Sequence, residues 1–185
     1  MADPHLWLVC GMPTTGKTTF GNWLRDHRGY LHLDLESRDC LETNGLPSFW
    51  LERIWNLDGP GLSEFVTYLR SLGREVILTW AFHTDLIPFV RDMVADGIEP
   101  WWFEGDWLAA RTGHARRAQI LKHGVYSRGA PDLEGWDRYV ASLVARWAEI
   151  EPIFGPNIVR TLDADGGYLH PELILVAMQA RRIMD

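Results

Sequence analysis

The fold of this 185-residue chain is decided by the stretch Gly11-Met-Pro-Thr-Thr-Gly16-Lys17-Thr18. It follows the apolar run Leu6–Cys10, which predicts a buried strand, and it leads into a helical pattern over Thr18–His27. A glycine-rich turn between a strand and a helix, closed by lysine and threonine, matches G-x-x-x-x-G-K-[ST], the P-loop. The sequence therefore predicts that this segment binds the phosphates of a nucleotide.

Each position of the stretch has a physical task in holding phosphate. The glycines let the backbone turn sharply and direct successive N–H groups at phosphate oxygens, and the following helix presents its positive N-terminus to the same anion. Lys17 adds positive charge for the β- and γ-phosphates from an expected exposed loop, and the Thr18 hydroxyl is a hard oxygen ligand for Mg²⁺. The predicted nucleotide contacts are Gly11, Pro13, Thr14, Thr15, Gly16, Lys17, Thr18 and Thr19.

Strand and helix patterns alternate along the rest of the chain. Further strands are predicted over Tyr30–Leu35, Glu75–Phe82, Ile98–Phe103 and Asn157–Leu162. Such alternation predicts an α/β protein with a parallel sheet covered on both faces. We expect a three-layer αβα P-loop fold with five parallel strands in one domain, residues 1–185, with a core of 1–106 and 155–185. Residues 107–154 are expected to be mostly helical.

Helix limits follow from caps and periodicity. Leu46–Asn56 is predicted to be helical, and Ser63 is predicted to cap a helix that runs to Leu72. Trp136–Ile150 has the clearest 3.6-residue apolar period and is predicted to be one helix, capped by Asp132. A closing helix is expected over Pro171–Met184, because proline is favoured in a first helical turn.

The net charge is −7, which argues against nonspecific binding of nucleic acid because a phosphate backbone needs a basic face. The basic residues gather locally, however, since Trp107–Pro131 contains arginines and a lysine but no acid. This distribution favours a compact anionic ligand. Two cysteines are too few for a disulfide framework, and no stretch reaches the roughly 20 apolar residues that span a bilayer. A cytoplasmic protein without membrane contact is expected.

With these motifs in place, the chain resembles the small P-loop kinases. That group includes shikimate kinase, gluconate kinase, adenylylsulfate kinase, chloramphenicol phosphotransferase and the kinase half of polynucleotide kinases. The resemblance extends over the whole length, although only the P-loop is a sharp match. It implies an enzyme that uses ATP and Mg²⁺ to transfer the γ-phosphate to a hydroxyl group of a small molecule.

The resemblance also implies roles for residues after the second strand. Alternation places His32, Asp34 and Glu36 on one face, with Asp34 nearest the carboxyl end of the strand. By resemblance, Asp34 deprotonates the substrate hydroxyl or, with Thr18, holds the metal. The substrate is expected between this strand and Leu46–Leu62. The implied substrate contacts are Asp34, Glu36, Arg38 and Arg53.

The resemblance further implies that residues 107–154 form a helical lid and its adjoining helices. Arginines after the fourth strand close over ATP in these kinases, which implies catalytic roles for Arg116 and Arg117 and nucleotide binding for Arg111. In these kinases the loop after the fifth strand lies beside the adenine, which implies nucleotide binding for Asp163 in that loop. The third strand lacks the aspartate of motor ATPases and GTPases, and the roles of Thr79, His83 and Asp85 are left open.

Two functions of other classes remain open from the sequence, and a nucleoside monophosphate kinase is a third possibility among the enzymes. Asp34 followed by Arg38 is also the arrangement of a polynucleotide 5′-hydroxyl kinase, although the net charge opposes it. A nucleotide-binding regulatory or toxin-type module with little turnover shares the same architecture. The sequence identifies neither the acceptor nor the oligomeric state.

Overall fold

A computed structural model describes residues 4–56, 60–122, 133–163 and 165–182 of the chain. Its centre is a sheet of five parallel strands in the order β2-β3-β1-β4-β5. The strands are β1 (Leu6–Gly11), β2 (Leu31–Asp34), β3 (Val76–Ala81), β4 (Glu99–Glu104) and β5 (Ile158–Arg160). The expected α/β class, with five parallel strands and helices on both faces, is confirmed.

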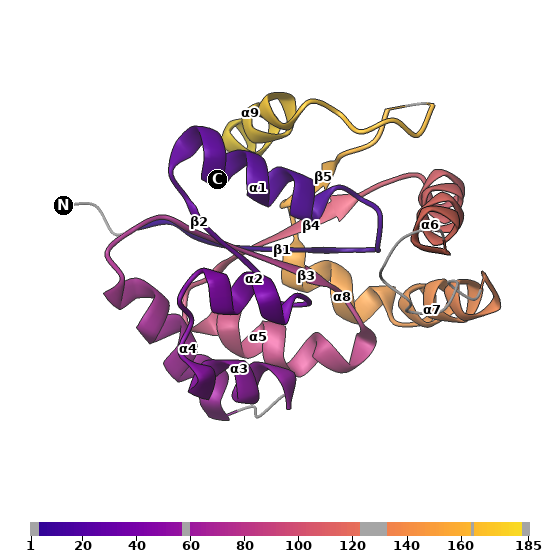
Figure 1. Ribbon diagram of the computed structural model, residues 1–185. Helices are drawn as coiled ribbons and strands as arrows, with labels where there is room; N and C mark the ends of the chain where they lie inside the picture. Colours follow the sequence, from indigo (N-terminus) through magenta and orange to yellow (C-terminus); the bar gives the residue numbers. More distant parts are fainter. Residues whose placement is uncertain (1–3, 57–59, 123–132, 164, 183–185) are drawn as a thin grey trace.

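Alternate residues of the central strands point to two separate cores, which makes the fold three-layered (Figure 1). On one face, Trp7 and Val9 of β1 pack with α1 (Lys17–Arg28) and α9 (Pro171–Arg182). On the other face, Leu8 and Cys10 of β1 belong to a larger core shared with the remaining helices. These include α2 (Arg38–Thr43), α3 (Ser48–Trp55), α4 (Pro60–Ser71), α5 (Ile87–Ala95) and α8 (Trp147–Phe154), with the short 3₁₀ turn η1 (Thr84–Leu86) before α5.

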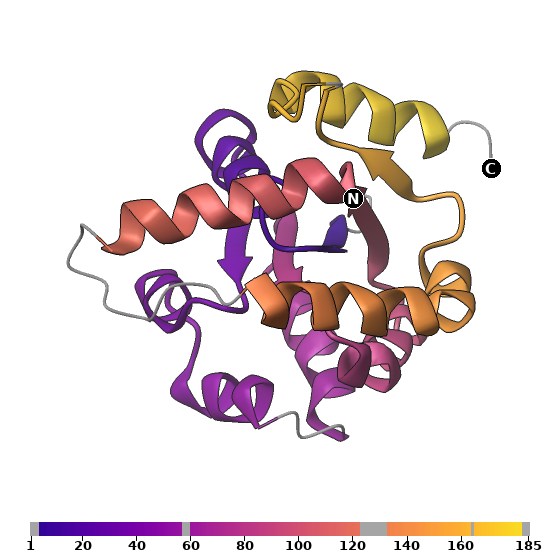
Figure 2. The same cartoon turned by 90° about the vertical axis from the view of Figure 1, so that its right-hand side faces the viewer.

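Two long helices lie beyond the carboxyl ends of β1 and β4. They are α6 (Trp107–Lys122) and α7 (Leu133–Ala145), which run side by side in Figure 2. The Arg111 guanidinium forms a bidentate ion pair with Asp137, with distances of 2.8 and 3.0 Å. The rings of His114 and Trp136 have centroids 4.6 Å apart. These contacts join α6 to α7.

The periodic stretch Trp136–Ile150 is not one helix, so that prediction was wrong. Arg146 has φ −113° and ψ 14° and separates α7 from α8. Its side chain donates to the Glu149 carboxylate and to the Thr84 carbonyl. The next residue, Trp147, packs against Trp102 of β4, with ring centroids 5.3 Å apart. The apolar period continues across the break because both helices bury one face in the same core.

Other helix limits also differ from the predictions. Ser63 lies inside α4, which begins at Pro60, because a proline is compatible with a first helical turn. The short helix α2 was not predicted, although Ser37 caps it by accepting from the Cys40 backbone N–H. The predicted cap Asp132 lies outside the described residues. Within the described part of the chain, no helix combines the length and apolarity needed to cross a membrane.

Candidate nucleotide and acceptor site

A cavity of about 660 Å³ opens at the carboxyl edge of the sheet, where ligands bind in open α/β folds. The P-loop and the start of α1 form its floor, the end of β2 forms one side, and α6 with the loop after β5 forms the other. Its lining residues are Pro13, Thr14, Gly16, Lys17, Thr18, Thr19, Asn22, Asp34, Glu36, Ser37, Ala109, Gly113, Leu162, Gly166 and Tyr168.

Two glycines give the loop its shape. Gly16 has φ +83°, a left-handed conformation that favours glycine, and it precedes α1 directly. Gly11 has φ +145°, and a Cβ atom there would lie 2.5 Å from the Phe103 carbonyl oxygen of β4. Any other residue at position 11 would therefore push the loop away from the sheet.

The N-terminus of α1 faces this cavity without a side-chain cap. The first N–H groups of a helix have no acceptor within the helix, and the helix dipole makes this end positive. Lys17, Thr18 and Thr19 supply these groups and all three line the cavity. The geometry therefore fits an anion such as a nucleotide phosphate.

Lys17 is the first residue of α1 and is buried, with 5% of its surface exposed. Its Nζ donates to the carbonyl oxygens of Gly11, at 3.1 Å, and Met12, at 2.7 Å. The expectation that Lys17 lies in an exposed loop was therefore wrong, because Lys17 is a buried helical residue whose ammonium group is bonded to the loop carbonyls.

Three threonine contacts fix the loop to its surroundings. Thr14 has φ 64°, unusual for a residue other than glycine, and its hydroxyl donates to the Ala110 carbonyl of α6 at 2.8 Å. The Thr15 hydroxyl donates to the Met12 carbonyl. The Thr161 hydroxyl, next to β5, donates to the Thr15 carbonyl at 2.8 Å. The loop is thus held by α6 and by the segment after β5.

Thr18 and Asp34 meet on the β2 side of the cavity. The Thr18 hydroxyl donates to Asp34 Oδ2 at 2.9 Å, and Asp34 Oδ1 accepts from the Glu36 backbone N–H at 3.1 Å. Asp34 is buried, with 8% of its surface exposed. A hydroxyl and a carboxylate at this distance are hard oxygen donors of the kind that Mg²⁺ binds, usually together with waters and phosphate oxygens. Among the described residues, no three His, Cys, Asp or Glu side chains are grouped to hold a metal by themselves.

Glu36 and Ser37 line the same side of the cavity. Glu36 is exposed, and its Oε2 accepts from the Ala81 backbone N–H at 3.0 Å, at the end of β3. Beyond β3, the His83 ring contacts Tyr139 of α7, with centroids 5.1 Å apart. The Tyr139 hydroxyl donates to the Phe82 carbonyl, and burial raises the pKa of Tyr139. Asp85 lies in η1 and, like His83, does not line the cavity in the described structure.

The three predicted arginines with described side chains do not line the cavity. Arg38 pairs with Glu42 and Glu52, Arg53 pairs with Glu64, and Arg111 pairs with Asp137. Arg116 and Arg117 lie on α6, but their side chains are outside the described structure. Exposed ion pairs contribute little to the free energy of folding, so these arginines could leave their acidic partners to bind a ligand at small cost.

The loop after β5 lines the cavity through residues other than Asp163. Asp163 Oδ1 accepts from the backbone N–H groups of Asp165 and Gly167, which closes the turn. Gly166 and Tyr168 line the cavity instead, and Tyr168 is 55% exposed. A Cβ atom at Gly16 would lie 3.1 Å from the Tyr168 ring, so this ring lies against the P-loop.

Sequence reasoning missed Asn22, Ser37, Ala109, Gly113 and Tyr168 as lining residues. Ala109 and Gly113 are four apart on α6, and a Cβ at Gly113 would lie 3.4 Å from Thr14 Cβ, so small residues let α6 approach the loop. That spacing is visible in the sequence. Asn22 is one helical turn beyond Thr18, which is also a readable signal. Nothing in the sequence indicates that Tyr168 returns to the P-loop.

Comparison with solved structures places this arrangement in context. A shikimate kinase from Acinetobacter baumannii in complex with shikimate matches 99% of this chain and 96% of its own, with a TM-score of 0.59 and 13% identity. The fold is that of the small P-loop kinases. A gluconokinase from Sinorhizobium meliloti 1021 matches this P-loop kinase fold over 100% of this chain and 94% of its own, with a TM-score of 0.54 and 13% identity.

No protein-family model and no curated protein matches the sequence. The shared property is therefore the P-loop kinase fold, because a sequence identity of 13% supports a common architecture but does not identify the substrate.

Proposed function

We propose that the protein is an ATP-dependent phosphotransferase that transfers the γ-phosphate to a hydroxyl group of a small molecule. The observation that supports it most is the contact of Thr18 with Asp34 at the wall of a cavity whose floor is a P-loop. An uncapped helix N-terminus, which suits a phosphate, and a buried carboxylate therefore lie side by side. That pairing suits transfer between a bound nucleotide and an acceptor hydroxyl.

The nucleotide would be held along the floor of the cavity. Backbone N–H groups of the loop and of Lys17, Thr18 and Thr19 would face the phosphates, and the Lys17 ammonium would offset their charge. The base and ribose would extend toward Ala109, Gly166 and Tyr168, which line the other side. Arg111, Arg116 and Arg117 on α6 are proposed to stabilise charge on the γ-phosphate when α6 closes.

Asp34 is proposed to act on the acceptor. Its carboxylate would take the proton of the acceptor hydroxyl while the oxygen forms a bond to the γ-phosphorus. The bond between that phosphorus and the β–γ bridging oxygen breaks, and ADP leaves with the electron pair. The products are the phosphate ester and ADP, and no covalent enzyme intermediate is needed.

Mg²⁺ is the proposed metal, held by the Thr18 hydroxyl together with phosphate oxygens, and Asp34 would join these ligands only as the alternative to its role as the base. When bound, it would neutralise charge on the β- and γ-phosphates. Glu36 and Ser37 are the proposed acceptor contacts, since both line the cavity beside Asp34. Arg38 and Arg53 would have to exchange their present glutamate partners to reach an acceptor.

Thermal unfolding with ligands tests the proposal. The midpoint is measured with ATP·Mg²⁺, GTP·Mg²⁺ and ADP, alone and with sugars, polyols, amino alcohols, antibiotics and an oligonucleotide. A ligand that binds only the folded state raises the midpoint. We expect a shift with ATP·Mg²⁺ that one class of small molecule increases, followed by transfer of labelled γ-phosphate to that compound. No shift with any nucleotide would disprove the proposed function, and transfer to the oligonucleotide alone would assign a polynucleotide kinase.

A further inference from the structure

Asn22 lines the same cavity as Thr18 and Asp34, yet the proposed reaction gives it no task. It lies on α1 one helical turn beyond Thr18, so both side chains project from the same side of the helix. It is half-buried between the cavity and the interface of α1 with β2. This position makes its amide a neighbour of the acceptor end of the site.

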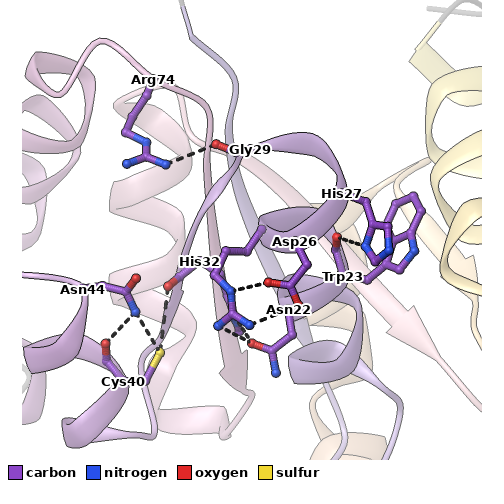
Figure 3. A network of polar contacts seen from close by, with 10 residues as sticks. Asn22, Trp23, Asp26, His27, Gly29, His32, Cys40, Asn44 and Arg74 are labelled. Atoms are coloured by element: carbon purple, nitrogen blue, oxygen red, sulfur yellow. Dashed lines mark hydrogen bonds and ion pairs between the residues drawn. The ribbon is translucent and has the colours of Figure 1, made fainter.

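The orientation of the Asn22 amide follows from its partners (Figure 3). Arg25 Nη1 lies 3.2 Å from Asn22 Oδ1, and a guanidinium only donates, so this amide atom is the oxygen. His32 Nδ1 lies 3.0 Å from the same oxygen and must therefore carry its proton. His32 Nε2 is then an acceptor, and the Thr79 hydroxyl donates to it at 3.0 Å.

The surrounding structure fixes which group donates and which accepts in the hydrogen bonds that join Thr79, His32 and Asn22. His32 has 0% of its surface exposed, and burial disfavours the imidazolium, so the ring carries one N–H. A Cβ atom at Gly21 would lie 2.4 Å from His32 Nε2, which shows how closely the ring packs on α1. Thr79 is also buried and pairs with Asp34 in the register of β2 and β3. The ring cannot turn without breaking two hydrogen bonds.

With Oδ1 taken by two donors, the N–H₂ group is the part of the planar amide left for the cavity. We propose that Asn22 binds the acceptor by donating to an oxygen next to the hydroxyl that is phosphorylated, with His32 and Thr79 as positioning residues. This assignment rests on the proposed function. Asp34 would then accept a hydrogen bond from the reacting hydroxyl, and Asn22 would donate one to the oxygen on the neighbouring carbon. This pattern matches a molecule with oxygens on neighbouring carbons, such as a polyol or a sugar.

The variant Asn22→Asp tests the role of the N–H₂ group. Aspartate keeps the shape and an oxygen for Arg25 and His32, but replaces the donor with a second acceptor. Wild-type and variant proteins are assayed with polyols and sugars, each paired with its analogue that lacks the neighbouring oxygen. For the phosphorylated compound we expect kcat/KM to fall about tenfold or more, because a buried hydrogen-bonding group is left unmatched. The deoxy analogue should react equally with both proteins.

The controls separate this inference from the proposed function. ADP·Mg²⁺ affinity and the thermal midpoint should stay near the wild-type values, and Asn22→Ala should repeat the result if aspartate disturbs folding. Equal loss for a compound and its deoxy analogue, or a loss confined to ADP affinity, would overturn the assignment of Asn22. If the wild-type protein transfers phosphate to no compound of the panel, the proposed function fails and this inference fails with it.

The positioning role has its own test. Thr79→Val removes the hydroxyl that donates to His32 Nε2, and Thr79→Ser keeps it. We expect the valine variant to raise KM for the phosphorylated compound while ADP affinity is unchanged, and the serine variant to restore KM. A serine variant as impaired as the valine variant would mean that Thr79 contributes packing only, which would overturn its positioning role.

Discussion

The Thr18 hydroxyl donates to Asp34 Oδ2 over 2.9 Å, which joins the end of the P-loop to the end of β2. If Asp34 is the base, Asp34→Asn should reduce kcat at least about 100-fold, because general-base catalysis contributes on that order. ATP·Mg²⁺ affinity should change little, since the amide can still accept from Thr18. Kinetics and a titration with a non-hydrolysable ATP analogue measure both quantities.

Asp92→Asn on α5 is a matched control, because this exposed acid lies on a helix that does not line the cavity. It should leave both kcat and affinity unchanged. A collapse of ATP·Mg²⁺ affinity in Asp34→Asn, with kcat preserved at saturation, would instead make Asp34 a metal-site residue.

Lys17 is a second test of the site. Lys17→Ala should lower phosphoryl transfer at least about 100-fold, because its charge stabilises the developing negative charge. The variant should also lose about 1–2 kcal/mol of unfolding free energy, since Lys17 donates to two loop carbonyls. Lys17→Met keeps the aliphatic stem and should be equally inactive. Near-normal turnover in either variant would rule out the P-loop as the phosphate site.

Tyr168 lies against Gly16 at the side of the cavity proposed for the base. Tyr168→Ala should weaken ADP binding about fivefold or more, because stacking of a base on an aromatic ring contributes on the order of 1–3 kcal/mol. Binding of inorganic tripolyphosphate should not change, and Tyr168→Phe should behave as wild type. Equal weakening of ADP and tripolyphosphate would show that Tyr168 supports the loop rather than the base. Calorimetric titration measures all three.

Burial of His32 predicts a loss of stability in mild acid. Burial lowers the pKa of this imidazole to about 4 from the usual 6.5. The unfolded chain then binds a proton at a higher pH than the folded protein, so the stabilisation is complete above pH 6.5 and is lost as pH falls toward 4. The full effect is about 3 kcal/mol. Urea unfolding at several pH values measures it against His32→Gln, and equal pH dependence in the two proteins would contradict the prediction.

The sequence was sufficient for the central architecture because its signals there are local. The apolar run Leu6–Cys10, the glycine turn and the helix after Lys17 are adjacent in the chain, and the structure places them as β1, the loop and α1. Buried parallel strands are continuous apolar runs, which a single sequence reveals well. The fold class and the identity of the P-loop were therefore predictable.

Features that depend on contacts distant in sequence were not predictable. The break at Arg146 arises where Trp147 meets Trp102, and the apolar period alone gives no sign of it. Tyr168 reaches Gly16 only because β5 lies at the far edge of the sheet and its loop returns to the P-loop. The ion pairs of Arg53 with Glu64 and of Arg111 with Asp137 join different helices, so a single sequence does not reveal them. The pair of Arg38 with Glu42 is local, but it lies in α2, which was not predicted.

Gly21 stands in the interior of α1, where glycine costs about 1 kcal/mol relative to alanine. The cost is tolerated because a Cβ atom there would lie 2.4 to 2.8 Å from three atoms of the His32 ring. Positions 21 and 32 should therefore vary together during evolution. Among related chains, alanine at position 21 is expected only where position 32 carries a smaller side chain, and a histidine at 32 requires glycine at 21.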